Sequence, residues 1–157
     1  MADDELKLAG IDLSIVDVPK YIHPSVYICY SKIKNAGLGI FAKKKIVKGT
    51  LLGEYMGEII DNPTIDDDTE YIFGSYDFCI DARDLEKSNY TRFINCITSY
   101  EEENVISILN STDYIYNKNL KNRIFLFAKK DILENEELLY DYGDKYRNSL
   151  GINPSEN

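Results

Sequence analysis

Apolar residues along the chain fall in short runs that alternate with polar positions or with turn residues, a pattern typical of strands. The runs predict strands over 26–30, 37–42, 51–55, 58–60, 71–73, 76–80, 105–109, 115–116 and 123–128. Gly74 and Ser75 predict a hairpin turn, and 85–94 holds at most one short helix. Because strands and helices do not alternate, we expect a mainly β (α+β) domain rather than a parallel α/β fold.

The sequence also contains a weak internal repeat. The segment 40–49 is echoed by 126–135, with Gly49 in one copy where Asn135 stands in the other. Both residue types tolerate the positive φ that tight turns need. We interpret the copies as two similar hairpins that each lead a tyrosine, Tyr55 or Tyr142, toward a shared centre, with chance similarity as the alternative.

Length and charge narrow the class of protein. A chain of 157 residues indicates one domain, and its 27 acidic against 18 basic residues give a net charge of −9. This charge disfavours direct nucleic-acid binding and favours a basic, lysine-containing peptide as partner, although it could also serve solubility alone. The apolar runs are too short to span a membrane, and the acidic N-terminus does not resemble a secretion signal. We therefore expect an intracellular protein, nuclear or cytoplasmic and not secreted.

Metal binding is not expected. The three cysteines, Cys29, Cys79 and Cys96, are far apart in the sequence, and His23 is the single histidine. No Cys-x-x-Cys pair is present, so a zinc site built from this chain alone is disfavoured and reduced thiols are expected.

Two segments carry candidate chemistry. Tyr140 and Tyr142 are two residues apart, so on an extended chain their side chains share a face and their hydroxyls can converge, which suits the handling of an amine. The turn 36–39 contains two glycines, which let backbone amides approach a ligand closely. It lacks the third glycine of a dinucleotide fingerprint and the Gly-Lys-Ser/Thr of a phosphate loop.

These segments belong to an ordered series of motifs. The chain carries Gly-Leu-Gly-Ile-Phe-Ala at 37–42, Lys-Gly-Thr at 48–50, Gly-Glu-Tyr-Met-Gly-Glu-Ile-Ile at 53–60, Ile-Asp-Ala-Arg at 80–83, Asn-Tyr-Thr-Arg-Phe-Ile-Asn at 89–95 and Glu-Glu-Leu-Leu-Tyr-Asp-Tyr-Gly at 136–143. Together they resemble the SET domain of protein lysine methyltransferases, in a minimal form of viral or microbial type. The Asn95-Cys96 pair resembles the PR-type branch, and 137–144 resembles histone monomethylating enzymes.

The resemblance implies a SET-domain fold of small curved sheets with a C-terminal pseudoknot, in which the segment ending at Gly143 threads beside 92–95. It implies a lead-in over 1–24, a SET domain over 25–146 and a short tail over 147–157. It further implies a protein-lysine N-methyltransferase, a chromatin regulator that transfers methyl groups from S-adenosylmethionine, with S-adenosylhomocysteine as product, to a lysine of a basic peptide such as a histone tail. The oligomeric state stays open, with a homodimer as one option.

Site residues follow from the same resemblance. Tyr142 is the expected catalytic residue, which orients the amine rather than acting as a general base, since the pKa of a free tyrosine is about 10. The remaining expected residues are those of the substrate channel, Tyr55, Tyr140 and Tyr71, and those of the cofactor site, Ala36, Gly37, Leu38, Gly39, Tyr90, Arg92, Phe93, Asn95, Cys96 and Tyr146. Tyr90 could equally be a core aromatic, and Asn95 could also brace the threaded backbone.

Two departures from the family pattern leave alternative interpretations of the function open. Cys96-Ile97-Thr98 stand where most SET domains have His-Ser-Cys, and the cysteine-rich tail that often closes the cofactor pocket is missing. Tyr146 is the nearest residue that could cover the pocket instead. The alternatives are a weakly active or inactive SET/PR-type protein-binding module and an unrelated β domain with coincidental motifs.

Overall fold

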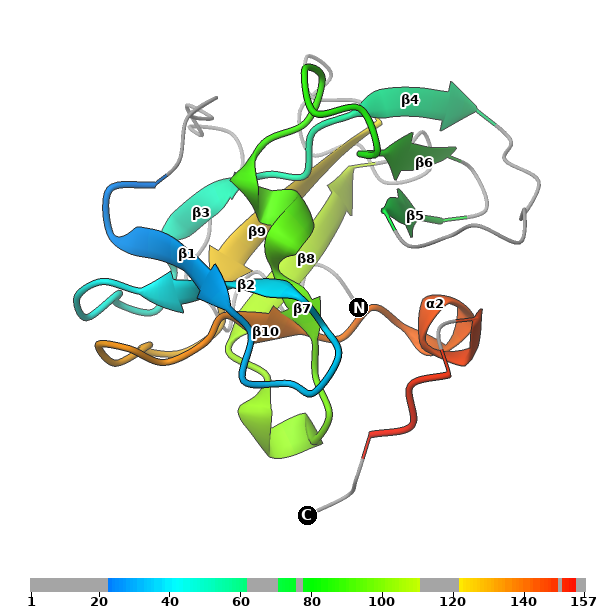
Figure 1. Cartoon of the computed structure of the whole chain (residues 1–157). Coiled ribbons are helices and arrows are strands. Elements are labelled where there is room, and N and C mark those ends of the chain that lie inside the picture. Colours follow the sequence, from blue (N-terminus) through cyan, green and yellow to red (C-terminus); the bar gives the residue numbers. More distant parts are fainter. Residues whose placement is uncertain (1–22, 62–70, 76–77, 111–121, 150, 155–157) are drawn as a thin grey trace.

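The computed structural model describes residues 23–61, 71–75, 78–110, 122–149 and 151–154, and these form four small sheets (Figure 1). The strands are β1 (Val26–Tyr30), β2 (Leu38–Ala42), β3 (Leu51–Glu54), β4 (Glu58–Asp61), β5 (Ile72–Gly74), β6 (Phe78–Asp81), β7 (Asn95–Cys96), β8 (Val105–Asn110), β9 (Arg123–Ala128) and β10 (Leu139–Tyr140). Two 3-10 helices, η2 (Tyr90–Phe93) and η3 (Tyr100–Glu102), and one α-helix, α2 (Asp144–Ser149), complete the described elements. The prediction of a mainly β fold of small sheets is confirmed.

The predicted strands and the observed ones agree closely. The expected short helix is the 3-10 turn η2, the predicted strand at 115–116 lies outside the described residues, and residues 76–77 of another predicted strand do so as well. Helix α2 was not predicted; it crosses the boundary expected at 146 between the domain and its tail. Residues 1–22 of the expected lead-in also lie outside the described part.

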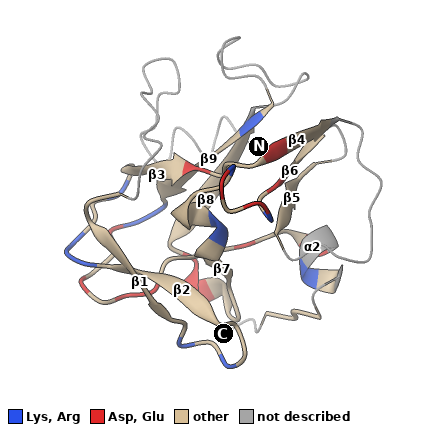
Figure 2. Cartoon of the chain, turned by 45° about the horizontal axis from the view of Figure 1, so that its top comes forward, with Lys and Arg blue, Asp and Glu red and all other residues tan. Residues whose placement is uncertain are grey.

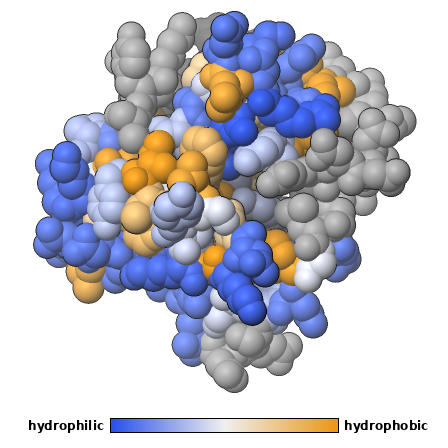
Figure 3. All heavy atoms as spheres, viewed as in Figure 1, coloured by the Kyte–Doolittle hydropathy of each residue, from blue (hydrophilic) through white to orange (hydrophobic). Residues whose placement is uncertain are grey.

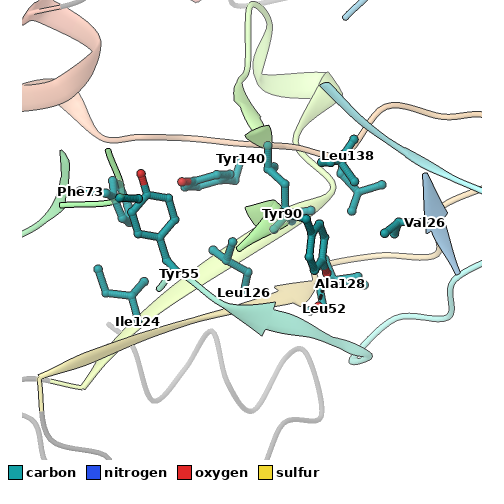
Figure 4. Packing of buried hydrophobic residues seen from close by; sticks show 14 of the residues in the cluster. Val26, Leu52, Tyr55, Phe73, Tyr90, Ile124, Leu126, Ala128, Leu138 and Tyr140 are labelled. Atoms are coloured by element: carbon teal, nitrogen blue, oxygen red, sulfur yellow. Dashed lines mark hydrogen bonds between the residues drawn. The ribbon is translucent and has the colours of Figure 1, made fainter. Parts of the chain in front are cut away.

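The core forms around β9, which has β3 on one side and β8 on the other. Its residues from Ile124 to Ala128 are all buried, because both of its faces are covered. Figure 4 shows Leu126 and Ile124 packing beneath Tyr55, Tyr90 and Tyr140. Charged positions lie mostly in turns and at strand ends (Figure 2), as for the ion pair between Glu54 and Arg123, whose Nη2–Oε2 distance is 2.7 Å.

The two copies of the internal repeat make matching backbone hydrogen bonds to each other in the structure. Ile46 and Ile132 exchange backbone hydrogen bonds of 2.8 Å in both directions. The Gly49 amide donates to the Ala128 carbonyl, and the Asn135 amide donates in the same way to the Ala42 carbonyl. Gly49 and Asn135 have φ of 86° and 68°, as the turn chemistry predicts. The two hairpins therefore face each other as an approximate two-fold pair.

The segment 136–140 is threaded between two other parts of the chain. On one side, the Leu138 amide donates to the Ile40 carbonyl of β2 at 2.8 Å. On the other side, β10 pairs in parallel with β7, with Leu139 opposite Asn95 and Tyr140 opposite Cys96. Backbone groups on both edges are thus satisfied, which a buried strand requires. This arrangement is the predicted pseudoknot.

Asn104 fastens the threaded segment. Its side chain, in a residue that is only 3% exposed, donates to the Glu137 carbonyl and accepts from the Leu139 amide, both at 2.9 Å. One side-chain amide therefore takes the place of a neighbouring strand at Glu137 and Leu139.

Replacing Asn104 with alanine is expected to lower the free energy of unfolding by about 1–3 kcal/mol, because two buried backbone groups lose their partners. Urea unfolding measures this change. Asn153→Ala, at an exposed asparagine, is the matched control and is expected to leave stability unchanged. Equal stability of the two variants would show that Asn104 does not fasten the segment.

Candidate functional site

A cavity of about 560 Å³ opens between the loop that follows β1 and the segment running from η2 into β7. Several of the predicted cofactor residues line it, namely Ala36, Gly37, Leu38, Arg92, Phe93, Asn95 and Cys96. Tyr71 and Tyr142 line it as well, together with residues that sequence reasoning did not select: Ile33, Lys34, Asn35, Thr98 and Ile152. The structure thus brings residues from distant parts of the chain to one cavity.

The loop wall of the cavity has a fixed shape. The Ser31 amide donates to the Gly37 carbonyl at 2.8 Å, which closes the loop, and Gly37 has a φ of 72° that favours glycine. Gly39 lies behind this wall rather than on it. A Cβ at Gly39 would come within 3.0 Å of Glu137 Oε2, so glycine is needed for the close approach of that carboxylate.

Glu137 is a buried carboxylate that sequence reasoning missed. It is 7% exposed and accepts hydrogen bonds from the Ser31 hydroxyl at 2.7 Å and the Lys32 amide at 2.8 Å. The Asn95 side-chain nitrogen donates to the Leu38 carbonyl at 2.9 Å and approaches Glu137 Oε2 at 3.5 Å. Because the two protons of this amide have protein acceptors, its oxygen is the atom able to accept a hydrogen bond from a ligand.

Arg92 forms part of the opposite wall. Its guanidinium donates to the Ala82 carbonyl at 2.8 Å and the Arg83 carbonyl at 3.0 Å. It also stacks 4.0 Å from the centre of the Tyr71 ring, a cation–π contact that fixes both side chains. The Tyr71 carbonyl accepts a hydrogen bond from the Tyr55 hydroxyl at 2.9 Å, which links this wall to the aromatic residues described next.

Four aromatic rings gather next to the cavity. Phe73, which was not predicted, is central: its ring centroid is 5.8 Å from Tyr55, 5.4 Å from Tyr140 and 6.0 Å from Tyr142. Tyr140 and Tyr142 are 4.8 Å apart, so the two-residue spacing does bring these rings together. In Figure 4 the hydroxyls of Tyr55 and Tyr140 lie on the same side, near Phe73. We call Tyr55, Phe73, Tyr140 and Tyr142 the aromatic cluster.

Tyr142 belongs both to the aromatic cluster and to the cavity wall. Its hydroxyl donates to the Ile94 carbonyl at 2.8 Å, which fixes the direction of the proton, and a phenol oxygen is by its chemistry also an acceptor. Tyr142 is therefore the residue through which the two regions meet.

Two buried side chains of the site, Tyr140 and Cys96, are held in their neutral forms. Burial raises the pKa of Tyr140 well above its usual range, and the neighbouring Tyr142 and Tyr55 add to the rise. Burial also raises the pKa of the Cys96 thiol to about 11, so Cys96 stays protonated near neutral pH and is a poor nucleophile.

Besides Gly39, one other described residue among those predicted for the cofactor does not line the cavity. Tyr90 is buried in the core, where its hydroxyl donates to the Leu52 carbonyl, which is the core alternative raised by the sequence. Tyr146 belongs to α2, but its side chain lies outside the described part of the structure.

The described residues contain no group of three or more His, Cys, Asp and Glu side chains placed to hold a metal ion. Among the described residues no disulfide joins the cysteines; Cys79 and Cys96 are buried, whereas Cys29 is exposed. Within the same ranges, no helix has the length and apolar character needed to cross a bilayer.

The sequence of this chain is similar to that of a curated histone methyltransferase. The chain is 34% identical over 124 residues to histone-lysine N-methyltransferase set-17 of Caenorhabditis elegans, an alignment that covers 76% of this chain and 41% of that protein. The chain thus spans less than half the length of this curated relative.

Solved structures show the same fold. A ctPRC2 structure bound to S-adenosylmethionine gives a TM-score of 0.59 at 26% identity, covering 81% of this chain and 16% of that one. A KRYPTONITE structure with mCHH DNA, an H3(1-15) peptide and SAH gives a TM-score of 0.56 at 29% identity, covering 75% of this chain and 23% of that one. The family model described as SET domain matches residues 37–143, which include Gly37 and Leu38 of the cavity loop, the β7–β10 pair and the aromatic cluster. The chain belongs to the SET domain family.

Proposed function

We propose that this protein is an S-adenosylmethionine-dependent protein-lysine N-methyltransferase. The observation that carries the proposal is the double role of Tyr142, which lines the cavity and also belongs to the aromatic cluster. A cofactor in the cavity and a lysine side chain in the cluster would meet at this residue. The family relationship and the S-adenosylmethionine and SAH in related structures support the same assignment.

The cavity residues suit S-adenosylmethionine in size and polarity. A volume of about 560 Å³ lies within the ordinary range for a cofactor site. Asn95 offers an amide oxygen, the acceptor that the ammonium of the cofactor's amino-acid part requires. Ile33, Leu38 and Ile152 supply apolar walls for the rest of the molecule. When bound, S-adenosylmethionine supplies a methyl group on a sulfonium that is open to attack by an amine.

The aromatic cluster suits the other reactant. Aromatic faces attract a lysine ammonium on entry, and the apolar surroundings then favour its neutral, nucleophilic form. The Tyr142 hydroxyl donates a hydrogen bond to the Ile94 carbonyl, and its oxygen can accept an N–H of the amine. Such a contact would aim the nitrogen lone pair toward the cavity. The joint placement of Asn95 and Tyr142 favours an enzyme over an inactive binding module.

The net charge of the chain indicates the class of its substrate. A net charge of −9 favours a basic peptide, and a histone tail is the leading candidate, in agreement with the histone peptide in the related KRYPTONITE structure. We further propose that the protein is an intracellular chromatin regulator, nuclear or cytoplasmic, that needs no metal and does not bind nucleic acid directly. Whether it works as a monomer or a homodimer is left to experiment.

Tyr142→Phe is expected to lower the rate of methyl transfer to a lysine peptide about 10²–10³-fold, the usual effect of removing one preorganised polar group at a reacting centre. Mass spectrometry of the peptide measures the rate. Binding of S-adenosylmethionine, followed by calorimetry, is expected to persist because the ring still lines the cavity. An unchanged rate would remove Tyr142 from the mechanism, and a parent protein without transfer to any histone peptide would overturn the proposed activity.

Tyr140 is expected to restrict the product mainly to monomethyl-lysine. Its buried, neutral hydroxyl belongs to the aromatic cluster, where it can hold the amine or an ordered water that further methylation would have to displace. Tyr140→Phe should therefore allow dimethyl- and trimethyl-lysine to form without a large loss of rate. The measurement is the distribution of products at long reaction times, and trimethyl-lysine made readily by the parent protein would contradict it.

A further inference from the structure

The cavity has a wall that is built by the residues after the matched SET segment. Ile152 lines the cavity and packs on the small apolar cluster of Cys96, Ile97 and Leu139, on which Ile33 and Tyr142 also pack. Figure 1 shows α2 and the segment after it on the same side of the molecule as β7 and β10. Ile152, which follows the matched segment in sequence, thus contributes to the cavity.

One side chain ties this wall to the rest of the fold. Arg147 is only 8% exposed, and its Nε donates to Asp141 Oδ1 at 2.7 Å. The guanidinium also pairs with Asp144 and lies 5.9 Å from the centre of the Tyr100 ring in η3. A guanidinium buried to this degree is costly to leave without its carboxylate partner, so the pair with Asp141 holds Arg147 in place.

The backbone of Arg147 completes the connection. Its amide donates to the Gly143 carbonyl at 2.9 Å, and its carbonyl accepts from the Ile152 amide at 2.8 Å. Arg147 is therefore bonded on one side to the residue that follows Tyr142 and on the other to the residue that lines the cavity. Asp141, its main partner, directly precedes Tyr142 in the chain.

We propose that Arg147 is the positioning residue for a metal-independent wall of the cofactor cavity, with Ile152 as the side chain that contacts the cofactor. The Asp141–Arg147 ion pair fastens this wall by side chains alone, and the described residues offer no metal cluster that could do so. Because Asp141 adjoins Tyr142, the ion pair holds the cavity wall and the proposed catalytic tyrosine as one unit. This inference rests on the proposed function, since it takes the cavity to be the cofactor site.

The test is calorimetric titration of S-adenosylhomocysteine into the parent protein and two variants, Arg147→Gln and Ile152→Ala, at a temperature well below unfolding. Each variant is expected to bind at least about tenfold more weakly than the parent. Arg147→Lys, which keeps the charge but loses the forked geometry, should recover part of the affinity. Amide hydrogen exchange without ligand supplies an independent readout: the Ile152 amide should exchange faster in Arg147→Gln, whereas the Leu126 amide in β9 should not change.

Two control variants separate a local effect from general destabilisation. Arg123→Gln removes an arginine from an ion pair with Glu54 away from the cavity, and Leu133→Ala trims an exposed aliphatic side chain. Both are expected to bind S-adenosylhomocysteine like the parent. Parent-like affinity or unchanged exchange at Ile152 in Arg147→Gln, or an equal loss of affinity in Arg123→Gln, would overturn the positioning role. Parent-like affinity in Ile152→Ala would overturn its contact with the cofactor. A parent that does not bind the ligand would overturn the proposed function and this inference with it.

Discussion

The threading of residues 136–142 between β2 and β7 is the constraint on which the rest of the structure depends. Along this extended segment, alternate side chains point to opposite sides. Leu138 and Tyr140 are buried in the main core with Tyr142 packed against it, whereas Leu139 joins the small cluster beneath the cavity. Glu137 and Asp141 reach the cavity loop and α2. The side chains on one face of this segment therefore pack in the core, and those on the other face contact both walls of the cavity.

This arrangement couples stability to function. Burying the Glu137 carboxylate would be unfavourable without partners, and the Ser31 hydroxyl and the Lys32 amide provide them. The same carboxylate holds the cavity loop against the threaded segment. Any change that loosens the segment therefore also moves the loop and the side chain of Asn95, so that a loss of stability and a loss of ligand affinity are expected to occur together.

Local patterns predicted most of the strands, because short apolar runs and turn residues are readable without knowledge of distant contacts. The repeat predicted the turns at Gly49 and Asn135, and the spacing of Tyr140 and Tyr142 predicted that their rings meet. The family resemblance supplied the pseudoknot and most of the residues that line the cavity. Tyr90 shows a limit of both the local patterns and the family resemblance. A tyrosine in the core and a tyrosine at a cofactor site have the same local sequence signal.

The residues that were missed act over long separations in sequence. Glu137 bonds to Ser31 across 106 positions, and nothing near Glu137 indicates that a carboxylate is buried there. Phe73 is one more apolar residue in a hairpin until three tyrosines from other elements pack around it. Arg147 and Ile152 stand in a segment that resembles a polar tail, and only the buried ion pair with Asp141 reveals their connection to the site.

We propose that one cofactor site is formed by three segments: the loop after β1, the segment from η2 into β7, and the threaded strand. Hydrogen exchange with and without S-adenosylhomocysteine tests it most directly, because it maps protection onto individual segments. The account predicts that the ligand slows exchange in 33–38, 92–96 and 140–142 together. Protection confined to other segments, such as 100–103 and 134–136 at the neighbouring cavity lined by Glu102 and Glu136, or no protection at saturating ligand, would contradict it.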